Sequence, residues 1–198
     1  GHAVGLSDAT MNRHANTLLA FWEWAAQRDY CAGRNPFTGP RERLTPGKNV
    51  RGYLPWETDE LKGLFNPLPR RSDLIELMVV ALHTGMRLDE IASLRGNQVK
   101  KLEGVAFIQV EDAKTPAGNR QVPIHPRIAW LIDRAKQAGT ERVWLRFKPE
   151  GPGKKAGADA GREFSLFKHS RGFPSRQKAF HSFRKNVTLI MVRARVPE

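Results

Sequence analysis

The first thirty residues carry apolar side chains at helical spacing. Positions three and four residues apart share one face of an α-helix, so the pattern predicts a helix over residues 8–29. The apolar face consists of Met11, Ala15, Leu18, Trp22 and Ala25. A single helix has nothing against which to bury such a face. We therefore expect residues 1–37 to be the C-terminal part of a helical domain whose beginning lies outside this sequence.

The next segment loses this periodicity. Residues 38–53 are rich in glycine, proline, arginine and lysine and contain few apolar side chains, which predicts an interdomain linker. Its basic residues include Arg43, Lys48 and Arg51. Two interpretations stay open, namely a solvated linker or a strap that follows the phosphates of a nucleic acid. A second domain is expected over residues 54–198.

This second domain alternates between helical and strand-like patterns. The almost wholly apolar stretch 72–83 predicts a buried helix, and Gly85 supports a tight turn after it. Further helices are predicted from residue 58, from residue 88, over 127–138, from residue 164 and over 180–194. Two β-prone stretches, 105–110 and 121–124, predict a hairpin, whereas 149–161 is typical of a mobile loop. The expected fold class is mainly α with a small antiparallel β-sheet.

The charge of the chain points to a class of partner. The formal net charge is +13, which favours a polyanion, and a general RNA-binding protein is one interpretation that charge alone allows. No membrane partner is expected, because the chain lacks an apolar run of bilayer length and a basic amphipathic helix with a strongly apolar face. The single cysteine, Cys31, and the lack of a signal-peptide pattern predict a cytoplasmic protein, associated with the nucleoid if the source is bacterial.

Two arginine motifs carry the candidate chemistry. Arg87 lies in Thr-Gly-Met-Arg-Leu-Asp-Glu-Ile-Ala-Ser-Leu, and His181 and Arg184 lie in Phe-His-Ser-Phe-Arg. Two guanidinium groups aimed at one phosphate can stabilise the negative charge that develops in phosphoryl transfer. The histidine and arginine of the second motif are three residues apart and so share a helix face. Lys114 lies between the two motifs in the predicted hairpin, and Glu90 is placed one helical turn after Arg87 to orient it.

These motifs, in this order on a basic chain, resemble the tyrosine recombinases of the phage-integrase type. Residues 84–94 resemble that family's first arginine box, Lys114 its β-hairpin lysine and residues 180–184 its His-x-x-Arg box. The helix that ends at Asn-Pro-Phe, residues 35–37, resembles the end of its core-binding domain. The resemblance implies a site-specific recombinase that cleaves and rejoins duplex DNA through a 3′-phosphotyrosyl intermediate. It also implies self-association on DNA as a tetrameric synapse.

The resemblance implies a role for each matched side chain. Arg87 and Arg184 would grip the scissile phosphate, and Glu90 would support their geometry. Lys114 would protonate the departing 5′ oxygen, and His181 would assist by acid–base chemistry or hydrogen bonding. Further contacts with DNA are expected from Asn12, Arg13, Arg43, Lys48, Arg51 and Arg120. No metal or cofactor is expected, because the sequence has no cluster with metal-ligand spacing and no phosphate-binding loop.

The sequence departs from the family pattern at the tyrosine nucleophile. The family places this residue downstream of the last helix, and the sequence reaches Glu198 without one. Tyr30 lies in the first helical unit and Tyr53 at the end of the linker, so neither suits the place of the nucleophile. We therefore expect a missing C-terminal segment and an inactive fragment. The alternative is a non-catalytic DNA-binding accessory or regulatory protein.

Overall fold

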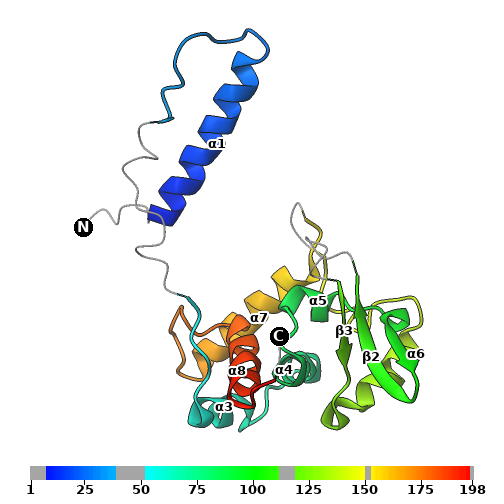
Figure 1. Ribbon diagram of the computed structural model, residues 1–198. Coiled ribbons are helices and arrows are strands. Elements are labelled where there is room, and N and C mark those ends of the chain that lie inside the picture. Colours follow the sequence, from blue (N-terminus) through cyan, green and yellow to red (C-terminus); the bar gives the residue numbers. More distant parts are fainter. Residues whose placement is uncertain (1–7, 39–51, 112–118, 150–152, 197–198) are drawn as a thin grey trace. The chain divides into compact units, whose positions relative to one another are not determined.

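Figure 1 shows the computed structural model of the chain. The residues that it describes are 8–38, 52–111, 119–149 and 153–196. The chain divides into two compact units, Gly1–Gly52 and Tyr53–Glu198. Across the described residues, no helix combines the length and the apolar character that crossing a bilayer requires.

Helix α1, Asp8–Ala26, lies in the first unit. Ala15 and Ala25 are buried on it, and Trp22 packs edge-on against Phe37 at 6.3 Å between ring centroids. The predicted apolar face is therefore partly covered by the segment that follows the helix.

Helix α1 ends before the predicted residue 29. Asp29 takes a left-handed conformation with φ of 58°, and the N–H of Tyr30 turns back to donate to the carbonyl of Ala25 at 3.0 Å. Such a turn satisfies a terminal carbonyl and prevents another helical turn.

The second unit is mainly helical with one small sheet (Figure 1). Its α-helices are α3 (Thr58–Phe65), α4 (Ser72–Thr84), α5 (Leu88–Ala92), α6 (Trp130–Ala138), α7 (Ala156–Ser170) and α8 (His181–Arg193). Its strands are β1 (Val99–Leu102), β2 (Val105–Val110) and β3 (Arg120–Pro123). Single 3₁₀ turns cover Gly96–Gln98 and Pro126–Ile128. The predicted fold class, mainly α with a small antiparallel β-sheet, is confirmed.

Helix α4 is the central element of the core. Leu77, Met78 and Val80 have no exposed surface, and the helix packs against α5, α7 and α8. The near-continuous apolar sequence is explained by neighbours on several sides of the helix. Gly85 ends the helix with φ of 63°, a left-handed conformation that glycine adopts without steric cost.

The sheet has one strand more than the sequence predicted. Its order is β1-β2-β3, with both pairs antiparallel. Strand β1 is largely exposed and contains two lysines, so it has no period-two apolar pattern to reveal it. Glu103 and Gly104, both with positive φ, form the tight turn that folds β1 back onto β2.

The prediction of a mobile loop over residues 149–161 is wrong from residue 156 onward. Helix α7 begins there, and Ala156 and Ala160 are buried. The N–H of Gly157 donates to Oδ1 of Asp89 at 3.0 Å, and a Cβ on Gly157 would lie 2.7 Å from the Cα of Asp89. The small residues that resemble a flexible loop in the sequence thus allow α7 to approach α5 closely.

Candidate active site

A tight turn places Arg87 at the end of the buried helix α4. The Thr84 hydroxyl donates to the carbonyl of Val80 at 2.7 Å and accepts from the N–H of Met86 at 3.2 Å. Arg87 then precedes the first residue of α5, with its side chain about half exposed. A side chain that leaves a rigid core element in this way is held at its base while its guanidinium stays accessible to a ligand.

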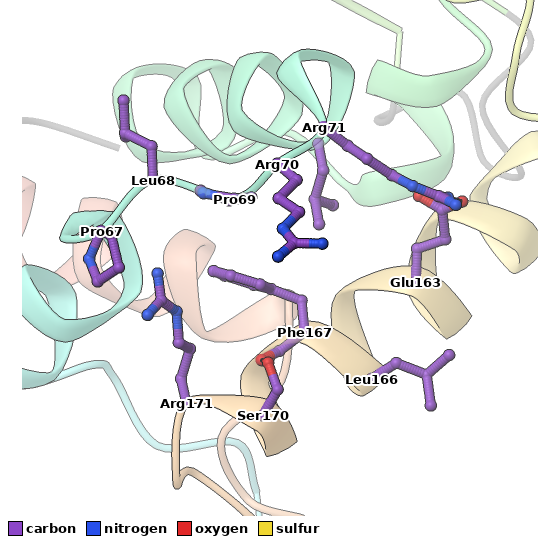
Figure 2. Close-up of a pocket in the computed structure, with 11 residues that line it drawn as sticks. Pro67, Leu68, Pro69, Arg70, Arg71, Glu163, Leu166, Phe167, Ser170 and Arg171 are labelled. Atoms are coloured by element: carbon purple, nitrogen blue, oxygen red, sulfur yellow. Dashed lines mark hydrogen bonds and ion pairs between the residues drawn. The ribbon is translucent and has the colours of Figure 1, made fainter.

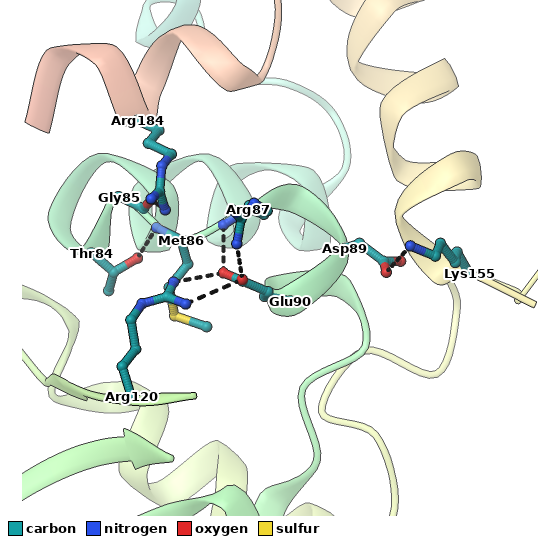
Figure 3. Close-up of polar contacts among 9 residues, drawn as sticks. All are labelled: Thr84, Gly85, Met86, Arg87, Asp89, Glu90, Arg120, Lys155 and Arg184. Carbon is teal, nitrogen blue, oxygen red and sulfur yellow. Dashed lines mark hydrogen bonds and ion pairs between the residues drawn. The ribbon is translucent and has the colours of Figure 1, made fainter. Parts of the chain in front are cut away.

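Glu90 connects Arg87 to the hairpin. Its carboxylate accepts from the backbone N–H of Arg87 at 2.8 Å and from Nη1 of the same residue at 2.9 Å. It also accepts from Nη2 of Arg120 at 2.8 Å and from Nη1 at 3.3 Å (Figure 3). Burial on its own raises the pKa of Glu90, but the hydrogen bonds from Arg120 and Arg87 outweigh it and lower the pKa to about 2. Glu90 is therefore ionised and holds two guanidinium groups side by side.

Arg184 projects from α8 to the same turn. Its Nη1 donates to the carbonyl of Gly85 at 2.8 Å (Figure 3). Burial lowers the pKa of Arg184, and the positive charges of Arg87 and Arg120 lower it further. The charges of both other arginines thus act on the guanidinium group of Arg184. One carboxylate among three guanidinium groups leaves the site positive, so a phosphate placed there would relieve the repulsion among them.

His181, at the start of α8, lies one helical turn before Arg184. Its side chain is half-buried. Burial lowers the pKa of His181, and the charges of Arg184, Lys185 and Arg87 lower it further. The imidazole is therefore neutral at neutral pH, with one nitrogen able to accept a proton and the other able to donate one.

The structure brings together four of the residues singled out in the sequence around this turn. These residues are Arg87, Glu90, Arg120 and Arg184. Arg120 was expected among the DNA contacts of a hairpin tip, but it is the first residue of β3 and bonds to Glu90. Thirty positions separate the two residues, so no local pattern predicts their pairing.

Other predicted site residues fall elsewhere. Lys114, Arg43, Lys48 and Arg51 lie outside the described residues. Asn12 and Arg13 lie on α1 in the first unit, where Asn12 is half-buried and Arg13 is exposed. Among the described residues, no group of three histidine, cysteine or carboxylate side chains could hold a metal ion.

Tyr53 is a neighbour of the site that sequence reasoning set aside. Its ring centroid lies 5.1 Å from that of His181, at an interplanar angle of 44°. The sequence contains no signal for this contact, because Tyr53 is the first residue of the second unit, whereas His181 begins the last helix of that unit, α8.

Two cavities differ in their relation to these residues. A cleft of about 580 Å³ adjoins the site, and its lining includes Arg120, Arg184 and the ring pair His83 and His125, whose centroids lie 5.0 Å apart in a tilted arrangement. A second pocket of about 480 Å³ lies between α7 and the segment that joins α3 to α4 (Figure 2). Its lining is formed by Pro67, Leu68, Pro69, Arg70, Arg71, Leu74, Glu163, Leu166, Phe167, Ser170 and Arg171. None of the arginines bonded around Glu90 or Gly85 lines this second pocket.

Solved structures provide the comparison, since no protein-family model and no curated protein matches the chain. The integrase of transposon Tn1549 in complex with transposon right end DNA is 16% identical, with a TM-score of 0.67 over 98% of this chain and 69% of its own. The XerH site-specific recombinase bound to palindromic difH substrate is 13% identical, with a TM-score of 0.64 over 98% of this chain and 59% of its own. The integrase from mycobacterium phage Brujita is 18% identical, with a TM-score of 0.52 over 98% and 61%.

The chain has the fold of the tyrosine recombinases. The expected likeness to this family is thereby confirmed at the level of the fold, which is what identities below 20% establish.

Proposed function

We propose that this protein binds duplex DNA and is a site-specific recombinase of the tyrosine type. The observation that carries the proposal is the grouping of three guanidinium groups around Glu90 and the Gly85 turn, with His181 on the same helix as Arg184. Solved proteins with this fold include an integrase and a recombinase in complex with DNA, which supports a DNA substrate. The net charge of +13 supports the same partner.

In the proposed mechanism, Arg87 and Arg184 bind the nonbridging oxygens of the scissile phosphate. A tyrosine hydroxyl attacks the phosphorus and gives its proton to His181. The bond from phosphorus to the 5′ oxygen breaks, and Lys114 gives that oxygen a proton. The product is a 3′-phosphotyrosyl bond, which keeps the energy needed for rejoining. His181 holds or moves a proton near the phosphate, and Glu90 keeps the arginines in place. The family resemblance implies that a tyrosine supplies the attacking oxygen.

The proposal extends to the organisation of the chain. Residues 1–37 belong to a core-binding domain, 38–53 form a basic linker and 54–198 belong to the catalytic domain. Asn12, Arg13 and the linker arginines contact backbone phosphates, and copies of the protein assemble on DNA as a tetramer. These statements rest on the resemblance and on the charge of the segments.

Binding can be tested with the chain as it exists. A target duplex is first selected from random sequences, and single phosphates are then replaced by uncharged methylphosphonates. If Arg184 contacts one phosphate, the loss of binding free energy from Arg184→Ala and the loss from neutralising that phosphate should not add. The two losses together should differ from their sum by about 1–3 kcal/mol. Arg193→Ala, on the same helix, is the matched control. Its loss of binding free energy should simply add to the loss from neutralising that phosphate. Additivity at every phosphate would refute the clamp, and tighter binding of structured RNA at matched salt would refute the choice of DNA.

Cleavage is tested with the longest natural form of the protein. On a nicked duplex that traps the intermediate, we expect a covalent protein–DNA adduct. Arg87→Ala and Arg184→Ala should reduce adduct formation far more than they reduce binding, because their grip tightens as charge develops. Specific binding without any adduct would favour the alternative, a non-catalytic accessory protein that uses the same cluster to hold a phosphate.

A further inference from the structure

Among the described residues, none fixes the imidazole of His181 by a hydrogen bond. Within the part of the chain that the structure describes, neither of its ring nitrogens has a hydrogen-bond partner, although the side chain is half-buried. Both nitrogens are thus available to a ligand. A ring that must present its nitrogens to a substrate needs another contact to fix its rotamer.

The ring of Tyr53 supplies such a contact. It lies 5.1 Å from the imidazole centroid in a tilted arrangement and is itself 46% exposed. An aromatic ring in this position limits rotation of the imidazole and shields one part of it from water.

Three hydrogen bonds hold the segment that carries Tyr53. The N–H of Leu54 donates to the carbonyl of Gln177, four residues before His181, at 2.9 Å. The side chain of Asn186 on α8 accepts from the N–H of Trp56 at 2.9 Å and donates to its carbonyl at 2.7 Å.

The indole of Trp56 anchors the end of the segment in the core. It is 2% exposed and packs against Phe164, Phe173 and Phe183, with ring centroids 5.8–6.2 Å apart. Phe183 lies on α8, two residues after His181. The segment is therefore joined to the helix that bears both His181 and Arg184.

We propose that Tyr53 is a positioning residue for His181, held against it by the pairing of Trp56 with Asn186. The role of His181 in catalysis comes from the proposed function, whereas the effect of Tyr53 on the imidazole does not depend on it. Tyr53 is also the first residue of the second compact unit. The first residue of that unit thus contacts His181 directly.

Three charged groups near His181 affect the pKa of its imidazole. Arg184 and Lys185 act from α8, and Arg87 acts from the start of α5. All three disfavour the imidazolium, as burial does. Removing the ring of Tyr53 opens the imidazole to water and leaves these charges in place. The pKa of His181 should therefore rise towards its ordinary range.

The experiment follows the imidazole by NMR in the chain as it exists, with ¹³C-labelled histidine and assignment by His181→Gln. Tyr53→Ala should raise the pKa of His181 and move its ring-proton resonances. Tyr53→Phe keeps the ring and should leave both unchanged. Asn186→Ala removes both bonds to Trp56 and should change them in the same direction as Tyr53→Ala. Tyr30→Ala, which removes a tyrosine 73% exposed in the first unit, is the control and should have no effect.

Several outcomes would overturn the proposal. An unchanged titration in a folded Tyr53→Ala protein would show that the ring does not shape the environment of His181. If Tyr53→Ala fails to fold, Tyr53→Leu is measured instead, with the same expectation. A Tyr53→Phe protein that behaves like Tyr53→Ala would assign the effect to the hydroxyl and not to the ring.

Cleavage by the longest natural form separates this proposal from the proposed function. If that form cleaves DNA, the pH profile of Tyr53→Ala should shift with the pKa of His181, and Tyr53→Phe should retain the wild-type profile. Loss of the covalent adduct in Tyr53→Phe alone would identify the hydroxyl as a reacting group and refute the positioning role. If the protein cleaves no DNA, the proposed function fails, while the NMR result on Tyr53 and His181 still decides the positioning role.

Discussion

Replacing Glu90 by glutamine tests the electrostatic core of the candidate site. The substitution keeps the shape of the side chain and removes its charge. Glu90 accepts hydrogen bonds from Arg87 and Arg120, and its side chain is only 15% exposed. A neutral amide would bind both guanidinium groups less strongly and would leave their repulsion with Arg184 unscreened. We expect Glu90→Gln to lower the free energy of unfolding.

The pKa of Glu90 sets the size of this effect. Its change from 4.5 to about 2 corresponds to roughly 3 kcal/mol, and solvent screening at a site open on one side reduces this to roughly 1–2 kcal/mol. Because the pKa is lowered on folding, the contribution is complete above pH 4.5 and is lost as the pH falls towards 2. The difference between wild type and Glu90→Gln should therefore be largest near neutral pH and shrink across that window.

The assay is denaturant unfolding of both proteins at a series of pH values. Taking the difference between the two curves cancels the carboxylates that they share. Asp133→Asn is the matched control, because Asp133 pairs with Lys136 while 76% exposed and should contribute little. A wild-type advantage that stays constant from pH 7 to pH 2.5, or that is no larger than for Asp133→Asn, would refute the assignment of Glu90 as the ionised centre of the cluster.

Three further predictions concern the core, the turn and the partner. Gly85→Ala should lower the free energy of unfolding by roughly 1–3 kcal/mol in denaturant unfolding, because φ is 63° and the new Cβ would lie 3.2 Å from Val187. Gly172→Ala, at φ of 81° with open space around it, should cost less. Equal losses in the two proteins would contradict the role of the contact with Val187. Phe183→Ala, at a fully buried position, should cost about 3–5 kcal/mol, whereas Leu166→Ala, 70% exposed, should change unfolding little. The affinity for duplex DNA should fall steeply between about 50 and 200 mM salt in a filter-binding or anisotropy assay, and a flat dependence would contradict a phosphate-binding surface.

The helices with strong periodicity were predictable from the sequence alone. Helix α4 follows from the largely apolar stretch 72–83 closed by Gly85, and α8 from the apolar face that includes Phe183. Both signals are local, because helical hydrogen bonds and capping glycines join residues four or five positions apart. The same locality explains why the second arginine motif could be placed on one helix face before the structure was known.

Elements whose stability depends on distant partners were missed. Strand β1 is a strand because it pairs with β2, and its own sequence, with two exposed lysines, does not predict it. The start of α7 reads as a glycine-rich loop, because only its approach to Asp89 on α5 explains why Gly157 must lack a side chain. In both cases the missing information lies in the surface that the segment contacts.

The sequence by itself determined the chemical inventory of this protein. It contains the two arginine motifs, their order, the positive charge and the apolar positions from which the core is built, because these are properties of residue type and spacing. Only the tertiary structure decided which of these groups meet. Arg120 reaches Glu90 across thirty residues, Arg184 reaches the Gly85 carbonyl across ninety-nine, and Tyr53 reaches His181 from the other end of the domain. The physical reason is that hydrogen bonds and ring contacts act over a few ångströms of space, whereas sequence patterns report only neighbours along the chain.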